Sequence, residues 1–177
     1  MKTKMTFILA AIILFGGCNL IKDAATVTID TDLTSALTVV VDAKKSADAL
    51  VVGDFPFTKT EELRLDQNTD IEPYLEKIRE IKLNSLEITI TGLLPGQVIS
   101  TISLDVDGVG NVCTQTNVSS ANSTFTPSVT ATTFKKVAEV LTNTHKITYT
   151  IHGFVNMPGT FVITSKYGAK VTAGALD

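Results

Sequence analysis

Several residue types that mark particular chemistries are scarce in this chain. Its 177 residues include no tryptophan, two histidines and two cysteines, and only 6% of them are aromatic. Carbohydrate-binding surfaces usually stack aromatic rings against sugars, so this scarcity argues against such a surface. The sequence has no phosphate-binding loop, no dinucleotide fingerprint and no G-x-S-x-G motif. It also lacks the Cys and His spacing of zinc sites. We therefore expect no enzymatic activity, no cofactor and no metal ion.

The net charge of the chain is also small. Fifteen Lys and Arg residues stand against 18 Asp and Glu residues, which gives a net charge of −3. A protein that binds nucleic acid needs basic side chains to displace the counterions around the phosphates. The sequence shows no basic patch, so we expect no nucleic-acid partner.

Long apolar runs are limited to the nine residues from Phe7 to Phe15, FILAAIILF. A helix needs about 20 apolar residues to cross a bilayer, so this run is too short to span one. Lys2 and Lys4 precede the run, and Gly16 and Gly17 follow it. A basic start, a short apolar core and small residues at the end are typical of a secretory signal peptide. The alternative is a buried N-terminal helix, but the run lacks the polar face that a surface helix should have.

The end of this run, Gly16-Gly17-Cys18, resembles the lipobox of bacterial lipoproteins. Phe15 departs from the family pattern, which usually has Leu or Val three residues before the cysteine. The resemblance implies that the Cys18 sulfur receives a diacylglycerol, that cleavage makes Cys18 the first residue, and that a fatty acid such as palmitate acylates its amine. Two or more acyl chains give stable membrane attachment. Asn19 is not the aspartate that retains enteric lipoproteins in the inner membrane, which implies the outer membrane.

These features divide the chain into a signal peptide at residues 1–17, a lipidated N-terminus and tether at 18–24, and a single β-rich domain at 25–177. Removal of the signal leaves 160 residues with 13 basic and 18 acidic side chains, and therefore a net charge of −5. This length is usual for one domain with its own core. Cys113 is then the one remaining free thiol, so no intramolecular disulfide can form. We interpret Cys113, in the sequence NVC, as a small apolar strand residue.

Most of the domain alternates apolar and polar residues with a period of two, which predicts half-buried β-strands. The clearest segments are residues 26–32, 33–42, 61–66, 86–90, 98–106, 145–155 and 160–167. Residues 44–57 predict an irregular strand, residues 115–128 a polar loop or weak edge strand, and residues 169–177 a last short strand. Pro95-Gly96 and Pro158-Gly159 are turn signals.

Two segments instead repeat apolar residues at spacings of three and four, which is typical of helices. The first predicts a helix over about residues 70–82, with Pro73 in its first turn and a capping residue among Asn68, Thr69 and Asp70. Its apolar stripe consists of Ile71, Tyr74, Leu75, Ile78 and Ile81. The second segment, residues 132–141, predicts a shorter helix. We expect the first stripe to pack on the core rather than to form a partner-binding groove.

Short alternating strands without a regular strand–helix–strand rhythm predict a mainly β fold. The expected architecture is an antiparallel β-sandwich with two short helices. A closed β-barrel and a two-layer α+β fold are the alternatives, because the strand pairing order, which separates them, is not readable from the pattern.

The two histidines are the first candidates for chemistry. His145 and His152 are seven residues apart, so on one strand they would face opposite sides and could not share a metal ion.

Acidic pairs are the second candidates. Asp30 and Asp32 share a strand face, as do Asp105 and Asp107, and solvated charge near a strand end is the ordinary explanation. The sequence DVDGVGN, residues 105–111, resembles the start of a calcium loop but lacks the ligands expected at its fifth and twelfth positions. We therefore predict a hairpin turn at Asp107-Gly108.

The sequence alone does not reveal a molecular activity. The first hypothesis is a non-catalytic envelope module, attached to the membrane through Cys18, that binds another protein or an envelope polymer. The second is a sandwich or barrel that carries a lipid-like small molecule in an apolar cavity, which a void above about 300 Å³ lined by both sheets would favour. An enzyme would require a cleft that holds a base within hydrogen-bond reach of a nucleophile.

Overall fold

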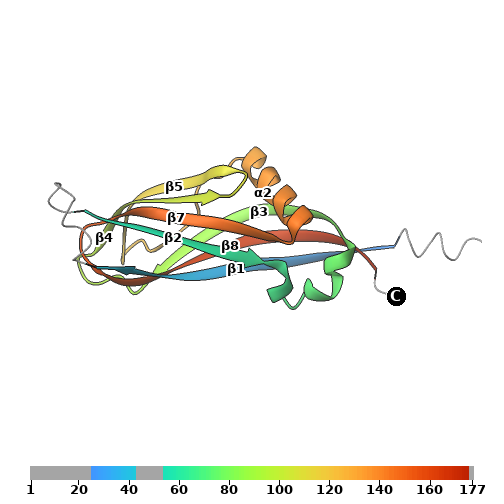
Figure 1. Ribbon diagram of the computed structural model, residues 1–177, viewed down its shortest axis with the longest axis horizontal. Coiled ribbons are helices and arrows are strands. Elements are labelled where there is room, and N and C mark those ends of the chain that lie inside the picture. Colours follow the sequence, from blue (N-terminus) through green and yellow to red (C-terminus); the bar gives the residue numbers. More distant parts are fainter. Residues whose placement is uncertain (1–24, 43–53, 176–177) are drawn as a thin grey trace, which may run out of the picture.

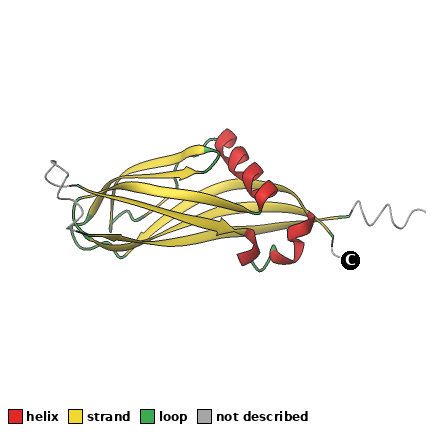
Figure 2. Cartoon of the chain, viewed as in Figure 1, coloured by secondary structure: helices red, strands yellow, loops and turns green. Residues whose placement is uncertain are grey.

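The computed structural model describes residues 25–42 and 54–175. Cys18, most of the predicted irregular strand at 44–57 and the last two residues lie outside these ranges. The described residues form two four-stranded antiparallel sheets packed face to face, with few helices (Figures 1 and 2). This confirms the predicted β-sandwich, and the separate sheets exclude the closed barrel.

Sheet A has the strand order β1-β8-β3-β6, and sheet B has the order β2-β7-β4-β5. The strands are β1 (Thr26–Val41), β2 (Phe55–Arg64), β3 (Ile78–Thr91), β4 (Val98–Val106), β5 (Gly110–Ser119), β6 (Thr124–Phe125), β7 (Lys146–Val155) and β8 (Gly159–Gly174). The helices are the 3₁₀-helices η2 (Leu65–Gln67) and η3 (Glu72–Lys77) and the α-helix α2 (Ala131–Thr144). Among the described residues, no helix is both long and apolar enough to cross a membrane.

Strands β1 and β8 pair along their whole length without a register shift, from Thr26 opposite Gly174 to Val41 opposite Gly159. The two alternating segments at 26–32 and 33–42 are therefore one strand of 16 residues. The predicted short strand at 169–177 likewise belongs, as far as Gly174, to the continuous β8. A strand of this length extends about 50 Å, which makes the sandwich long and narrow (Figure 1).

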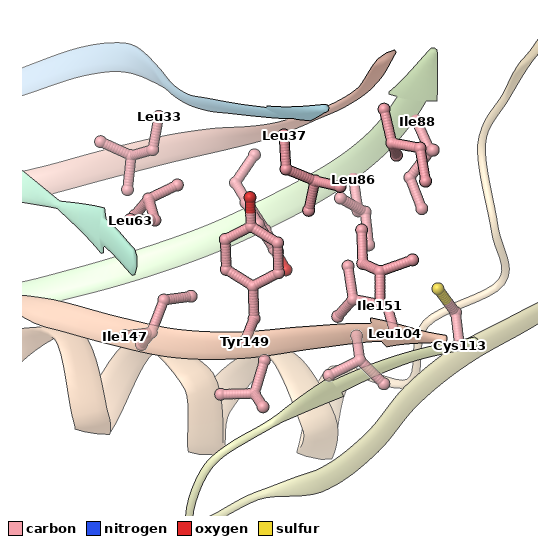
Figure 3. Close-up of a cluster of buried hydrophobic side chains, with 14 of the residues drawn as sticks. Leu33, Leu37, Leu63, Leu86, Ile88, Leu104, Cys113, Ile147, Tyr149 and Ile151 are labelled. Carbon is pink, nitrogen blue, oxygen red and sulfur yellow. The ribbon is translucent and has the colours of Figure 1, made fainter. Parts of the chain in front are cut away.

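The core lies between the two sheets and is built from the inward positions of the alternating strands. Figure 3 shows Leu33 and Leu37 of β1, Leu86 and Ile88 of β3, and Tyr149 and Ile151 of β7 meeting in one cluster. The largest fully buried side chains include Tyr149, Tyr167 and Phe161, each at most 1% exposed. Burying these faces is what holds the sheets together, since each apolar Å² removed from water contributes about 25 cal/mol.

The helix predicted over residues 70–82 is wrong in extent. A 3₁₀-helix covers Glu72–Lys77, and β3 begins at Ile78. The pairing of β3 with β8 shifts register between Ile78 and Glu80 and again between Leu83 and Ser85. A β-bulge inserts one extra residue, so two inward side chains on a bulged strand can be three residues apart, as in a helix.

The other predicted elements agree with the structure more closely. The segment 132–141 lies within α2. Asp107-Gly108 forms the turn between β4 and β5, where Gly108 has a φ of +77° that favours glycine. The polar segment 115–128 contains the end of β5 and the two-residue strand β6, which pairs with Ile88 and Thr89 of β3.

Candidate functional site

A surface groove lies between α2 and β3, with a volume of about 890 Å³. Residues 79–84 of β3 line one wall, and one face of α2 lines the other. In Figure 1, α2 lies along the flank of the sandwich beside β3 and β7. We call this feature the α2–β3 groove.

Helix α2 is stabilised by a cap at each end and is held against the sandwich by its buried side chains. The Thr130 hydroxyl accepts a hydrogen bond from the Thr133 N–H at 3.1 Å, which satisfies a free donor of the first turn. His145 ends the helix in the left-handed conformation, with a φ of +58°, and its N–H donates to the Leu141 carbonyl. Val137, Ala138 and Leu141 are buried and attach the helix to the sandwich.

The groove has an apolar floor. Ile81 and Leu83 contribute from β3, Phe134 and Ala138 contribute from α2, and Val129 contributes from the segment before the helix. Ile81, Leu83 and Ala138 belong to the core, and Phe134 and Val129 pack against it. The floor is therefore continuous with the hydrophobic core and does not depend on a mobile loop.

Charged side chains of both signs border this floor. Lys82 lies 3.1 Å from Glu80 on β3, and Lys135 lies 3.9 Å from Glu139 on α2. All four side chains are more than half exposed, so each ion pair contributes little to stability. Arg79 lines the groove as well, so three basic and two acidic side chains surround the apolar surface.

The acidic pair Asp30 and Asp32 lies elsewhere, on the outer face of sheet A. Asp32 pairs with Lys166 at 2.9 Å, and Asp30 lies 3.5 Å from Lys170. Both carboxylates also line a polar surface pocket of about 490 Å³ with Asp70, whose carboxylate accepts a hydrogen bond from Thr31. Partnered, solvated charge accounts for this pair, as the sequence analysis proposed.

The structure brings His152 and Asp105 together across β7 and β4. His152 Nε2 lies 2.8 Å from an Asp105 carboxylate oxygen, and Asn111 donates to the other oxygen at 3.0 Å. Ser103 lies opposite His152 in the strand register, but its hydroxyl bonds to that of Thr114. No pattern along the chain could reveal this group, because its members come from three strands.

This polar group lies on an open face of the sandwich. His152 and Asp105 are 44% and 37% exposed on the outer face of sheet B, and neither lines the α2–β3 groove. The Ser103 hydroxyl bonds to Thr114 at 2.9 Å, and His152 bonds to Asp105. His145 does not join the group, since it caps α2. Within residues 25–42 and 54–175, no three His, Cys, Asp or Glu side chains are arranged to hold a metal ion.

Cys113 lies inside the sandwich and is 7% exposed. In Figure 3 its side chain points from β5 into the core cluster. Burial raises the pKa of the Cys113 thiol to about 11, so the thiolate is scarce at neutral pH. This confirms the interpretation of Cys113 as a small apolar strand residue. Cys18, the predicted lipidation site, lies outside the described residues.

The sequence did not predict the α2–β3 groove. The one apolar stripe considered as a possible groove, in residues 70–82, was predicted to pack on the core. A partial signal was present in the second helical segment, since Phe134 and Ala138 continue toward Thr142 on one helical face. The sequence could not show that this face lies beside β3.

Comparisons with known proteins add a fold likeness only. No protein-family model matches this chain, and no curated protein matches it. Solved structures of mud crab tombus-like virus (TM-score 0.41, 10% identity, 86% of this chain and 82% of that chain) and of the decameric BFDV capsid protein (TM-score 0.40, 10% identity, 84% and 99%) are similar to it. Turnip yellow mosaic virus is similar at a TM-score of 0.37 and 12% identity, over 86% of this chain and 84% of that chain. A likeness at this level does not bear on the activity of the chain.

Proposed function

We propose that this protein is a lipid-anchored protein of the cell envelope, attached to the outer membrane through Cys18, and that its β-sandwich binds a partner molecule without transforming it. The α2–β3 groove is the observation that carries the binding part of the proposal. A groove of about 890 Å³ with an apolar floor and a few charged groups around it suits non-covalent binding.

The side chains around the groove support binding rather than catalysis. Its acidic groups, Glu80 and Glu139, are paired with neighbouring lysines. The histidine–aspartate pair, His152 and Asp105, lies away from the groove on an open sheet face. The groove lining therefore combines apolar, charged and amide or hydroxyl side chains, without a nucleophile held beside a base among them.

The anchor rests on the sequence from Phe7 to Cys18 and is tested by metabolic labelling with an alkyne fatty acid. We expect the wild-type protein and Cys113→Ala to carry label, and Cys18→Ala to carry none. Cys113→Ala is the matched control, because it removes the other cysteine of the chain. Equal labelling of Cys18→Ala and wild type would contradict the anchor.

Binding through the groove is tested by photocrosslinking in intact cells. A photoreactive amino acid replaces Lys135, which lines the groove, or Lys136, which is also exposed on α2 but does not line it. We expect an adduct from position 135 and none from position 136. No adduct at position 135, or equal adducts at both positions, would contradict groove binding. A lipid adduct at position 135 would favour the carrier hypothesis instead.

A further inference from the structure

The outer face of sheet B carries polar side chains that are hydrogen-bonded to one another across its strands. His152 Nε2 on β7 lies 2.8 Å from one carboxylate oxygen of Asp105 on β4, and Asn111 on β5 donates to the other oxygen at 3.0 Å. Beside this group, the hydroxyls of Ser103 on β4 and Thr114 on β5 lie 2.9 Å apart. These hydrogen bonds hold the side chains in defined positions, so a ligand that binds them has less conformational entropy to remove.

Phe154 continues this face beyond His152, since the two residues are two positions apart on β7 and therefore point to the same side. Phe154 is 47% exposed, and no other aromatic residue within 25–42 and 54–175 is as exposed. In the strand register it lies opposite Pro56 on β2 and Thr101 on β4, so shorter side chains flank the ring. The face thus combines one accessible phenyl ring with a group of fixed donors and acceptors.

Few formal charges lie on this part of sheet B. Asp105 is the one carboxylate in the hydrogen-bonded group, and toward β2 the face continues with the hydroxyls of Thr60 and Thr150, which lie 2.9 Å apart. The other charged side chains that the structure describes on sheet B and in its adjoining turns lie at the margins: Asp54, Lys59, Glu61, Glu62, Arg64, Asp107 and Lys146. Because these margins carry three basic and four acidic groups, an anionic polymer gains no net attraction here.

We propose that the outer face of sheet B binds a neutral polysaccharide chain, with one sugar ring stacked on Phe154 and sugar hydroxyls bound by Asp105 and Asn111. This site shares no residue with the α2–β3 groove and does not depend on the Cys18 anchor. The C–H face of a sugar ring is apolar, so it covers a phenyl ring without leaving polar groups unpaired.

The polar group offers both hydrogen-bonding roles that sugar hydroxyls need. An ionised carboxylate has about four acceptor sites, so Asp105 can accept from sugar hydroxyls while it holds His152 and Asn111. The Asn111 amide oxygen is a further acceptor. Threonine hydroxyls supply donors, among them that of Thr58, which is exposed and lies opposite His152 in the strand register.

A polysaccharide suits this face better than a protein partner does. A protein interface usually centres on several apolar anchors, with polar side chains at its rim. Here a single ring lies beside hydroxyl, imidazole and carboxylate groups, whose hydration a sugar hydroxyl can replace and an apolar anchor cannot. The low aromatic content of the chain argues against a surface of several rings, so we expect contact with one short stretch of polymer, within the roughly 14 Å that four strands span.

The proposal is tested by affinity electrophoresis of the mature protein in detergent, through native gels that each contain one polymer. The neutral polymers are hydroxyethyl cellulose, a mannan and glycol chitin, and polygalacturonate is the anionic comparison. We expect at least one neutral polymer to retard the wild-type protein relative to a gel without polymer. We expect polygalacturonate to leave its migration unchanged, because the face offers no basic side chain beside Asp105.

Variants of Phe154 separate ring stacking from general apolar contact. Phe154→Trp should keep or strengthen the retardation, whereas Phe154→Leu and Phe154→Ala should weaken the affinity for the polymer about tenfold or more. Leu94→Ala is the matched control, because Leu94 is also 47% exposed but lies in the turn after β3. We expect Leu94→Ala to bind as the wild type does.

The hydrogen-bonding group is tested by Asn111→Ala, which should weaken the affinity severalfold because the sugar loses an acceptor. Asn143→Ala is its control, since Asn143 is exposed on α2, and it should bind as the wild type does. Three results would each overturn the proposal: no retardation by any neutral polymer, equal retardation by polygalacturonate, or unchanged binding by Phe154→Leu.

A photoreactive phenylalanine at position 154 gives a second readout in intact cells. A glycan adduct supports the proposal, whereas a protein adduct without any glycan would show that the face binds a protein and that the proposal is wrong. The groove is probed at position 135, on another flank of the molecule, so either site can fail its test without the other.

Discussion

Two core tyrosines differ in whether their hydroxyl groups have partners. The Tyr149 hydroxyl donates to the Ser35 hydroxyl at 2.9 Å. Within residues 25–42 and 54–175, the Tyr167 hydroxyl and the Ser165 hydroxyl are buried without a partner. Burial raises the pKa of Tyr167, with smaller contributions from Cys113 and Tyr149, so its hydroxyl stays neutral. A buried polar group without a partner costs about 1–3 kcal/mol.

We therefore predict opposite effects for the same substitution at the two tyrosines. Tyr167→Phe removes an unpartnered hydroxyl and should leave the free energy of unfolding unchanged or raise it by up to about 1 kcal/mol. Tyr149→Phe removes a hydrogen bond and should lower it by about 1 kcal/mol. Urea denaturation of both variants checks this. A larger loss for Tyr167→Phe than for Tyr149→Phe would show that the Tyr167 hydroxyl has a partner in solution.

Cys113 gives a prediction of pH dependence. Burial raises its pKa from 9.0 to about 11 in the folded chain. Below pH 9 the thiol is neutral in both states, so its contribution to stability is fully present. Between pH 9.0 and about pH 11, the unfolded chain has released the thiol proton while the folded chain still holds it. The free energy of unfolding therefore falls over this range and levels off above the folded pKa. The loss should reach about 1 kcal/mol at about pH 10.

The measurement compares wild type with Cys113→Ala in urea at pH 8 and at about pH 10. We expect the free energy of unfolding to fall more between the two pH values for wild type than for the variant. The cavity in Cys113→Ala lowers its stability equally at both pH values, so it does not affect this comparison. Parallel losses in the two proteins would mean that the folded thiol ionises as readily as an exposed one. Slow reaction of folded Cys113 with a thiol reagent at neutral pH is the matching kinetic result.

At the scale of elements, the two Pro-Gly turns are joined to each other. The Gln97 side chain accepts a hydrogen bond from the Leu94 N–H at 2.9 Å and donates to the Met157 carbonyl at 3.0 Å. Asn156 reciprocates, since its side chain accepts from the Val98 N–H at 2.8 Å and donates to the Gly96 carbonyl. Gln97 is 1% exposed, so its two bonds are shielded from water, whereas Asn156 is exposed.

We predict that Gln97→Leu, which keeps the side-chain volume, lowers the free energy of unfolding by about 2 kcal/mol. The substitution leaves the Leu94 N–H and the Met157 carbonyl without their side-chain partner and removes a buried polar link between the turns. Gln67→Leu is the control, because Gln67 is exposed and should change stability by less than about 0.5 kcal/mol. Chemical denaturation measures both. Similar effects in the two variants would mean that the turns do not depend on Gln97.

Strand β3 shows where reading the sequence by periodicity fails. Its inward residues Ile78, Ile81, Leu83 and Leu86 are spaced three, two and three residues apart. The spacing of three results from bulges, which exist only because β8 pairs with β3 without matching insertions. In β1, where the spacing is uniform, the buried face was predicted correctly, because local alternation alone defines it, although the strand was predicted as two segments.

At the scale of the whole molecule, the two ends of the sandwich differ. The start of β1 lies at the end where η3 packs against β8, and Lys77 bonds the Ala175 carbonyl there. The Pro-Gly turns lie at the opposite end, about 50 Å away along β1 and β8. A lipid on Cys18 would attach the molecule near its η3 end, because only six residues lie between Cys18 and Ala25.

We therefore predict that, in liposomes with brominated lipids, a fluorophore at Glu76→Cys is quenched more than one at Pro95→Cys. Glu76 is exposed at the η3 end and Pro95 is exposed at the turn end. Both variants carry the native Cys18 and the buried Cys113. Equal quenching would show that the sandwich lies along the bilayer, and no quenching at either position would show that it is not held there.

The sequence by itself determined the buried faces of the uniformly alternating strands, the α2 helix, the turns and the mainly β class, whereas the strand order decided between sandwich and barrel. Each of these follows from interactions between residues close in the chain, or from the need to bury one alternating face. Only the tertiary structure decided the bulges of β3, the pair formed by His152 and Asp105, and the groove beside α2. These depend on which distant strands exchange backbone hydrogen bonds, and that choice leaves no periodic trace along the chain.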